Sequence, residues 1–236
     1  KNIKSCFIKK FHSNQIDEQK LLKSRGKLFI SPSRKEGLNF ASNAGYEVAI
    51  FDDGLQDNSI LYDLSFVCFN NLNWKGNGLT IPAGPLRESL KNLKKYKNIF
   101  LNGNLENLTE IKNEILKINS NINIHIGEYV PLNIQEFNKN NKYLIFSGIG
   151  NHKTFLSMLK KNGLNIVKDL EFPDHYTYKN HDIDKILKLS DQLKCKIITT
   201  EKDYLRLKKN NIYKINYIKV ELKILDEEKL ISTIVS

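Results

Sequence analysis

Two adjacent aspartates, Asp52 and Asp53, follow the apolar run YEVAIF and precede Gly54. Carboxylates at the carboxyl end of a strand can hold Mg²⁺ directly or through water, which is the usual arrangement in phosphoryl-transfer sites. In the alternative interpretation, Asp52 caps the following turn and Asp53 is solvated. Taken alone, the DDG stretch favours this turn interpretation over a metal site. The other segments of the chain bear on the choice.

A second candidate is the segment 76–88, GNGLTIPAGPLRE, which is rich in glycine and proline. Its composition predicts a shaped loop that opens a helix over residues 84–96, and backbone N–H groups at a helix start favour anions. Arg87 offers a guanidinium fork that matches a phosphate group. The alternative is an ordinary helix entry in which Arg87 pairs with Glu88 or is exposed.

A third candidate is Asp174 beside His175, in a loop that follows a predicted strand and a proline. A carboxylate can orient an imidazole ring and raise its basicity, which suits a catalytic base. The alternative is a structural histidine, which is the commoner role of a lone histidine. Sequence alone leaves both interpretations open.

A helix is predicted over residues 201–209, with Thr200 as its N-cap and Asp203 in the reciprocal position. Lys202 and Arg206 then share one face of this helix. We interpret the segment as mainly structural, with Lys202 near a phosphate as its functional alternative.

Short apolar runs alternate with polar helical stretches along the chain, and the apolar runs are continuous. Continuous runs are expected of parallel strands covered on both faces by helices, so the sequence predicts an α/β fold with a doubly wound parallel sheet. The polar stretch 135–142 marks a predicted boundary between domains at 1–134 and 135–236. In the second domain one strand is predicted over 213–222.

The chain has 236 residues, a formal charge of +11 and a pI of about 9.4. Such a balance indicates an anionic partner, such as nucleic acid, a membrane face or a phosphorylated substrate, although a genome biased toward Lys, Asn and Ile codons would also produce it. The lysines are spread along the chain with no nucleic-acid-binding motif, so we expect no nucleic-acid partner.

The three cysteines are far apart in the sequence and predict neither a disulfide framework nor a zinc site. This usage fits a reducing compartment. The longest apolar runs are strand-sized, so no membrane span is predicted, and no signal peptide is visible.

Taken together, these segments resemble the tetraacyldisaccharide 4'-kinase family, the kinases of lipid A biosynthesis in Gram-negative bacteria. The family's motifs occur here in the family's order and cover nearly the whole chain from about Asp17 onward. They are DDGLQ at 52–56, GNG at 76–78, PAGPLRE at 82–88, GIGN at 148–151, PDH at 173–175 and TEKD at 200–203. The combination of DDGLQ with a downstream PAGPLRE is specific.

The resemblance implies a P-loop-kinase-like α/β core, N-terminally incomplete in this chain, and a smaller C-terminal α/β domain. It implies transfer of the γ-phosphate of ATP, with Mg²⁺, to the 4'-hydroxyl of a tetraacyl disaccharide 1-phosphate. The implied location is the cytoplasmic face of the bacterial inner membrane, whose anionic surface is a partner of a peripheral enzyme, while this chain alone is expected to be soluble.

The resemblance also implies roles for individual residues. The acidic residues at the metal are Asp52, Asp53 and Glu18, and either Asp52 or Asp53 is the direct ligand. The residues that contact nucleotide or substrate phosphate are Gln56 and Arg87.

The implied catalytic residues are Asp17, Asp174 and His175. Asp17 helps to activate the sugar hydroxyl, and His175, with Asp174, pairs with Asp17 across an interdomain cleft. Such a carboxylate–imidazole pair can accept the hydroxyl proton. The sequence also departs from the family pattern at Ile16 for Gly, Asp57 for His, Tyr62 for Arg and Tyr176 for a second His.

The largest departure is the ATP-binding loop, because the pattern G-x-x-x-x-G-K-[ST] is absent from the sequence. Two explanations are open: a truncated piece of an active kinase, or a divergent homologue that is a non-catalytic scaffold. We expect truncation, because a parallel sheet that lacks its first strand exposes an unpaired edge. This chain alone is therefore expected to have little or no kinase activity.

Overall fold

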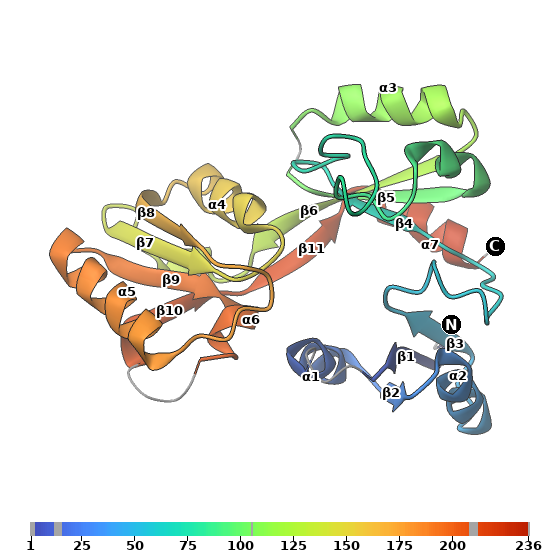
Figure 1. Cartoon of the computed structure of the whole chain (residues 1–236), viewed down its shortest axis with the longest axis horizontal. Coiled ribbons are helices and arrows are strands. Elements are labelled where there is room, and N and C mark those ends of the chain that lie inside the picture. The colour runs from blue at the N-terminus through green and yellow to red at the C-terminus, as the bar shows by residue number, and fades with distance from the viewer. Residues whose placement is uncertain (1–2, 12–15, 105, 208–211, 236) are drawn as a thin grey trace. The chain divides into compact units, whose positions relative to one another are not determined.

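The computed structural model describes residues 3–11, 16–104, 106–207 and 212–235. For residues 16–18 and 235 it describes the backbone alone. The chain forms two compact units, which are described separately: unit 1 is Lys1–Asp63 and unit 2 is Leu64–Ser236 (Figure 1). Among the described helices, none has the length and apolar content that crossing a membrane requires.

Unit 1 is a three-stranded parallel sheet with the strand order β2-β1-β3. Its elements are β1 Ser5–Lys10, α1 Ile16–Arg25, β2 Leu28–Ser31, α2 Arg34–Asn43 and β3 Val48–Phe51. Helix α2 covers one face of the sheet, where Ala41 and Ile8 share a small apolar core. The register pairs Ile8 with Phe51, so the next residues, Lys9 and Asp52, lie side by side at the carboxyl edge of the sheet.

Unit 2 contains two four-stranded sheets, the first in the order β11-β6-β5-β4. Its elements are β4 Val67–Asn70, the 3-10 helix η1 Leu90–Lys95, β5 Asn98–Gly103, α3 Leu108–Ile118, β6 Asn123–Pro131, β11 Val220–Ile224 and α7 Glu227–Val235. Strands β4, β5 and β6 are parallel, and β11 runs antiparallel to β6. On α3, Ile111 and Ile115 lie four residues apart, on one helix face, and pack in one core with Ile99 and Leu101 of β5.

The second sheet of unit 2 has the order β10-β9-β7-β8, and its strands are parallel (Figure 1). Its elements, with the preceding η2, are η2 Ile134–Glu136, β7 Lys142–Ser147, α4 His152–Lys161, β8 Asn165–Glu171, α5 Asn180–Leu193, β9 Lys196–Thr200, α6 Glu201–Tyr204, η3 Ile212–Lys214 and β10 Ile215–Ile218. Because side chains alternate along β7, Tyr143 and Ile145 face α4 while Leu144 and Phe146 face α5.

The chain order of this second sheet reverses between β7 and β9. From β7 the chain passes through α4 to β8 on one side, and β9 leads to β10 on the other side. In such doubly wound sheets the carboxyl ends of the two central strands border a crevice that is suited to a ligand. The segments that follow β7 and β8 carry the GIGN and PDH motifs at this edge, and TEKD spans the last residue of β9 and the start of α6.

The predicted α/β class with parallel strands is confirmed, but three predicted elements are wrong. The helix over 84–96 is only the 3-10 helix η1, because the amide and the carbonyl of Leu86 bond back to Leu79 and Ile81 in a closed loop. The helix predicted over 201–209 ends at Tyr204 and continues as a turn and a bend to Leu207, and residues 208 and 209 lie outside the described residues.

The third wrong element is the strand over 213–222, which is two strands in different sheets: β10 pairs with β9, and β11 pairs with β6. Asn133 holds the crossing point, since its side chain donates to the Tyr217 carbonyl and accepts from the Lys219 amide. Strand β1 and helix α1 are additional elements that the sequence did not predict. The boundary at 134/135 stays a prediction.

Candidate functional site

The two aspartates of the DDG turn follow directly on β3, at the carboxyl edge of the unit 1 sheet, as predicted. Lys9, on the central strand, donates from its Nζ to Asp52 Oδ2 at 2.6 Å. Lys9 is only 4% exposed, whereas the Asp52 side chain is 49% exposed. A buried ammonium group requires a compensating charge, and Asp52 supplies it while still facing water.

Arg34, at the start of α2, holds the backbone of the turn. Its Nη2 donates to the carbonyls of Asp53 at 2.7 Å and Asp52 at 3.2 Å, and its Nη1 donates to Asp57 Oδ2 at 3.2 Å. Hydrogen bonds from Ser59, and then the Arg34 guanidinium, hold the pKa of the Asp57 carboxyl below its usual value. Asp57, a departure from the family pattern, therefore helps to position the Arg34 guanidinium that holds the turn.

Tyr62, a second departure from the family pattern, supports the same turn. Its hydroxyl donates to the Gly54 carbonyl at 3.0 Å, and its ring packs edge-on against Phe51, with 5.3 Å between ring centroids. Asp53 has a φ of 56°, in the left-handed region that is uncommon for residues other than glycine. These contacts hold the turn that carries the two exposed aspartates.

The donor set at this edge fits Mg²⁺, which prefers carboxylate oxygens and commonly keeps several waters or phosphate oxygens. Within the described side chains, no group of three or more acidic, histidine or cysteine residues gathers around one point. Asp52 and Asp53 would therefore supply only part of a coordination shell. The predicted partners Asp17 and Glu18 lie in α1, and their side chains are outside the described residues.

The phosphate-contact candidates lie on irregular segments in different units. Gln56 is exposed in the turn after Asp53, in unit 1. Arg87 is exposed in unit 2, ahead of η1, and Glu88 accepts a hydrogen bond from the Asn92 side chain. Since only the short 3-10 helix η1 follows this loop, and no α-helix begins there, the helix-start argument for anion binding at Arg87 is wrong, and only its guanidinium fork remains.

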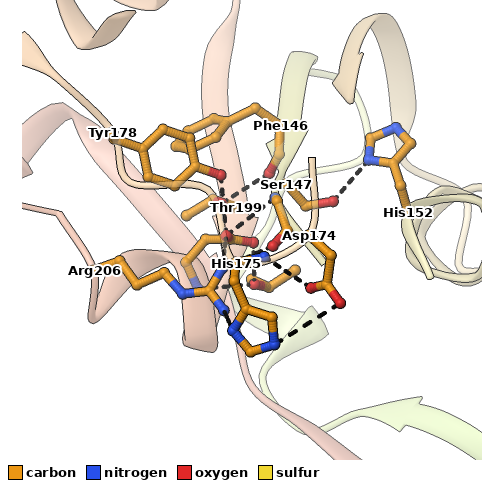
Figure 2. Close-up of polar contacts among 11 residues, drawn as sticks. Phe146, Ser147, His152, Asp174, His175, Tyr178, Thr199 and Arg206 are labelled. Atoms are coloured by element: carbon orange, nitrogen blue, oxygen red, sulfur yellow. Dashed lines mark hydrogen bonds and ion pairs between the residues drawn. The ribbon is translucent and has the colours of Figure 1, made fainter. Parts of the chain in front are cut away.

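Asp174 and His175 lie in the loop after β8, at the carboxyl edge of the second sheet of unit 2 (Figure 2). The His175 amide donates to the Asp174 Oδ1 atom at 2.9 Å and to the Gly148 carbonyl at 3.1 Å. The distance from His175 Nε2 to Asp174 Oδ2 is 3.9 Å. The structure thus brings the predicted pair together, with Asp174 exposed and His175 partly exposed.

Arg206 is a site residue that sequence reasoning did not connect with His175. Its Nη2 lies 3.3 Å from His175 Nδ1, and its Nη1 donates to the Gly148 carbonyl at 2.7 Å and to Asp203 Oδ1 at 3.1 Å. The available signal was the spacing of Asp203 and Arg206 by three residues, which is common for ion pairs. Nothing in the sequence indicated that the loop after β8, which carries His175, would contact the Arg206 guanidinium.

Asp203 lies beneath this loop and is fully buried. It accepts hydrogen bonds from the Gly148 amide at 3.0 Å, the Tyr178 hydroxyl at 3.0 Å and the Thr200 hydroxyl at 2.6 Å. Thr200 is the N-cap of α6, as predicted, and accepts from the Asp203 amide. Burial, and then the Asp203 charge, raise the pKa of Tyr178 far above its usual value, so its hydroxyl remains a donor.

A second histidine of this sheet, His152, forms a serine–histidine–aspartate row that is not a nucleophile site. Its Nδ1 lies 2.7 Å from the Ser147 Oγ atom (Figure 2). Its Nε2 lies 3.5 Å from Asp169 Oδ2. The Ser147 side chain is fully buried, so a substrate carbonyl cannot reach its hydroxyl. We therefore interpret this row as packing of the start of α4.

Comparison with known proteins identifies the family. The family model for tetraacyldisaccharide-1-P 4'-kinase matches residues 10–236. A tetraacyldisaccharide 4'-kinase of Pelagibacter ubique (strain HTCC1062) is 59% identical over 99% of this chain and 74% of its own length. That of Wigglesworthia glossinidia brevipalpis is 34% identical over 69% of this chain and 42% of its own length, so the chain spans less than half of that relative.

One solved structure has a similar fold. The structure described as an "apo" form of LpxK from Aquifex aeolicus in complex with ATP has a TM-score of 0.62 and 21% identity, and the match covers 98% of this chain and 78% of that chain. The resemblance carried by DDGLQ, PAGPLRE and PDH is thereby confirmed, and the chain belongs to the tetraacyldisaccharide-1-phosphate 4'-kinase family.

Proposed function

We propose that this protein is an ATP-dependent kinase that phosphorylates the 4'-hydroxyl of a tetraacyl disaccharide 1-phosphate in lipid A biosynthesis. Family membership supports the substrate class, and its relatives bear the name of this kinase. The observation that carries the chemistry is the exposed carboxylate pair at the end of β3, whose Asp52 is backed by the buried Lys9. Neither a scaffold nor a nucleic-acid-binding module is favoured by these findings.

Asp52 and Asp53, with Glu18, would hold Mg²⁺ in this proposal, and Gln56 and Arg87 would contact nucleotide or substrate phosphate. When bound, the ion neutralises charge on the phosphates and holds them for in-line transfer. The chain's own part is to hold the two exposed carboxylates at the edge of the sheet. The Lys9 ammonium beside Asp52 and the backbone turn held by Arg34 support this task.

Asp17, Asp174 and His175 would take up the proton of the sugar hydroxyl as oxygen attacks the γ-phosphate. Phosphoryl transfer needs positioning and charge neutralisation more than covalent chemistry, so a carboxylate with a well-placed imidazole is sufficient. The fixed backbone of the His175 loop supports this assignment, because a positioned ring contributes more than a mobile one.

The reaction is proposed to take place at the anionic cytoplasmic face of the inner membrane, with the enzyme as a peripheral protein. A tetraacylated substrate remains in a membrane, and the chain's charge of +11 favours an anionic surface.

A chimera tests the kinase function directly. A segment that carries the pattern G-x-x-x-x-G-K-[ST] is joined ahead of Lys1, because the sequence itself lacks this phosphate-binding pattern. With ATP, Mg²⁺ and tetraacyl disaccharide 1-phosphate, we expect 4'-phosphorylation by the chimera and none above background by the 236-residue chain. A folded chimera that binds ATP but leaves the lipid unphosphorylated would contradict the proposal.

A further inference from the structure

We propose that Arg206 is a positioning residue that sets the tautomer and the direction of the His175 ring, so that the neutral ring presents its Nε2–H toward the exposed side of the loop. What the ring does there rests on the proposed kinase function. The state of the ring itself rests on the contacts within unit 2 alone.

The direct contact decides the tautomer. Arg206 Nη2 lies 3.3 Å from His175 Nδ1 (Figure 2). A guanidinium group has N–H donors and no acceptor, so the ring nitrogen that faces it must accept the hydrogen bond. A neutral imidazole carries one N–H and one acceptor nitrogen, and its proton is therefore on Nε2. A proton on Nδ1 would set two donors against each other.

The aim of the guanidinium is itself fixed by buried groups. Nη1 donates to the Gly148 carbonyl at 2.7 Å and to Asp203 Oδ1 at 3.1 Å, which leaves Nη2 directed at the ring. The Arg206 side chain is 10% exposed, and the Asp203 side chain is fully buried. Asp203 is in turn held by the Gly148 amide and the Tyr178 hydroxyl. A planar fork held at one end has little freedom at the other.

The backbone of His175 is fixed from the same point. Its φ of 58° lies in the left-handed region, which is unfavourable for a residue with a Cβ, so the surrounding contacts must hold it there. The Gly148 carbonyl accepts both the His175 amide and the Arg206 Nη1, and so couples the loop to the guanidinium. Ring and backbone are thus set together.

The consequence for catalysis concerns which group accepts the proton. Nε2 lies 3.9 Å from Oδ2 of Asp174, whose side chain is exposed. The Nε2–H group is therefore near the exposed side of the loop, where it can donate to a carboxylate and orient it. In the proposed reaction, the ring donates to a carboxylate, and that carboxylate accepts the hydroxyl proton. Arg206 does not touch the reacting atoms and acts through His175.

The first test is the tautomer of His175 in the 236-residue chain, measured by ¹⁵N NMR at alkaline pH, where imidazole rings are neutral. A His175→Gln variant assigns the signal among the five histidines. We expect a protonated Nε2 and an accepting Nδ1 in the wild type. A ring protonated mainly on Nδ1 in the wild type would overturn the proposal.

Two Arg206 variants separate positioning from simple support of the loop. Arg206→Lys keeps a charge that can reach Asp203 or Gly148, but it has no fork to reach the ring as well. Arg206→Met keeps the apolar stem and removes the donors. We expect both to give a mixture of tautomers, and an unchanged Nε2–H ring in a folded Arg206→Lys protein would contradict the assignment.

Activity of the chimera tests the catalytic consequence separately. There we expect Arg206→Lys to lower kcat by about 10–100-fold, with the KM for the lipid changed by less than about threefold. Unchanged kcat despite a tautomer mixture would overturn the link to catalysis. A wild-type chimera without phosphate transfer would contradict the proposed kinase function, and the NMR result would then decide the present proposal by itself.

Discussion

The carboxyl edges of two parallel sheets each pair an aspartate with a basic side chain, but their burial differs. At the unit 1 edge, Lys9 is buried and Asp52 is half-exposed, and the two are 2.6 Å apart. At the edge of the second sheet of unit 2, Asp203 is fully buried, the Arg206 side chain is 10% exposed, and the two are 3.1 Å apart. The same kind of ion pair therefore presents a carboxylate to solvent in one place and hides it in the other.

This difference in burial distinguishes a carboxylate that stabilises the fold from a carboxylate that can bind a ligand. A buried carboxylate that accepts several hydrogen bonds stabilises the fold, as Asp203 does. The residues that donate to it are thereby held in fixed positions. A carboxylate with a buried counter-charge on one side and water on the other remains available to a ligand, as Asp52 is. Substitutions at the two edges should therefore behave differently.

The largest effect is expected at Asp203. Asp203→Ala removes a buried carboxylate from the largely covered Arg206 guanidinium and from the buried Tyr178 hydroxyl, and we expect it to lower the free energy of unfolding of unit 2 by about 3–5 kcal/mol. Urea denaturation followed by circular dichroism measures this. The matched control is Asp174→Ala, an exposed carboxylate at the same edge, which should cost about 1 kcal/mol or less. Equal losses in the two variants would remove the distinction between scaffold and site.

An intermediate effect is expected at the unit 1 edge, and it should be asymmetric. Asp52→Asn takes the negative charge from a buried ammonium and should cost about 1–3 kcal/mol of unfolding free energy. Lys9→Met keeps the apolar stem and leaves a carboxylate that water can solvate, so it should cost about 1 kcal/mol or less. Thermal unfolding of both variants measures the difference, and a larger loss for Lys9→Met would contradict the roles given to the two residues.

The smallest effect is expected at Asp57, and it should depend on pH. The folded-state pKa of Asp57 is lowered by Ser59 and Arg34, so its contribution is fully present above the unfolded-state pKa of about 3.9. That contribution is lost as pH falls through the lowered folded-state pKa. Asp57→Asn should therefore be less stable than the wild type at neutral pH and equal to it in strong acid. A stability difference that does not change with pH would exclude this source.

Much of the fold could be predicted from sequence because the apolar runs of parallel strands are continuous and the helices between them are amphipathic. β3, β5 and β7 and the helices α3 and α4 lie where these patterns placed them. The long strand at 213–222 failed because β-forming residues do not specify a partner. Asn133 contacts the chain between β10 and β11, where the predicted strand passes from one sheet to the other. No local sequence pattern encodes that change of sheet.

The candidate site was predictable where one motif carries it and not where distant segments meet. Asp52, Asp53 and Asp174 are visible as acidic residues after strands. Lys9 was not, because a lysine at the end of an apolar run is normally exposed, and its burial depends on the neighbouring strand. Arg206 contacts His175 only because the loops after β8 and β9 meet at one edge of the sheet.

In the proposed function, the exposed carboxylates of Asp52 and Asp53 after β3 hold the metal ion of the phosphoryl-transfer site, and the buried carboxylate of Asp203 after β9 does not. Mn²⁺, which shares the oxygen ligands of Mg²⁺, tests this by paramagnetic broadening of amide signals in the chain with ATP present. The account predicts broadening at Gly54 and Gln56 in the wild type and its loss in an Asp52→Asn, Asp53→Asn double variant. No broadening at Gly54 in the wild type, or broadening that persists in a folded double variant, would contradict it.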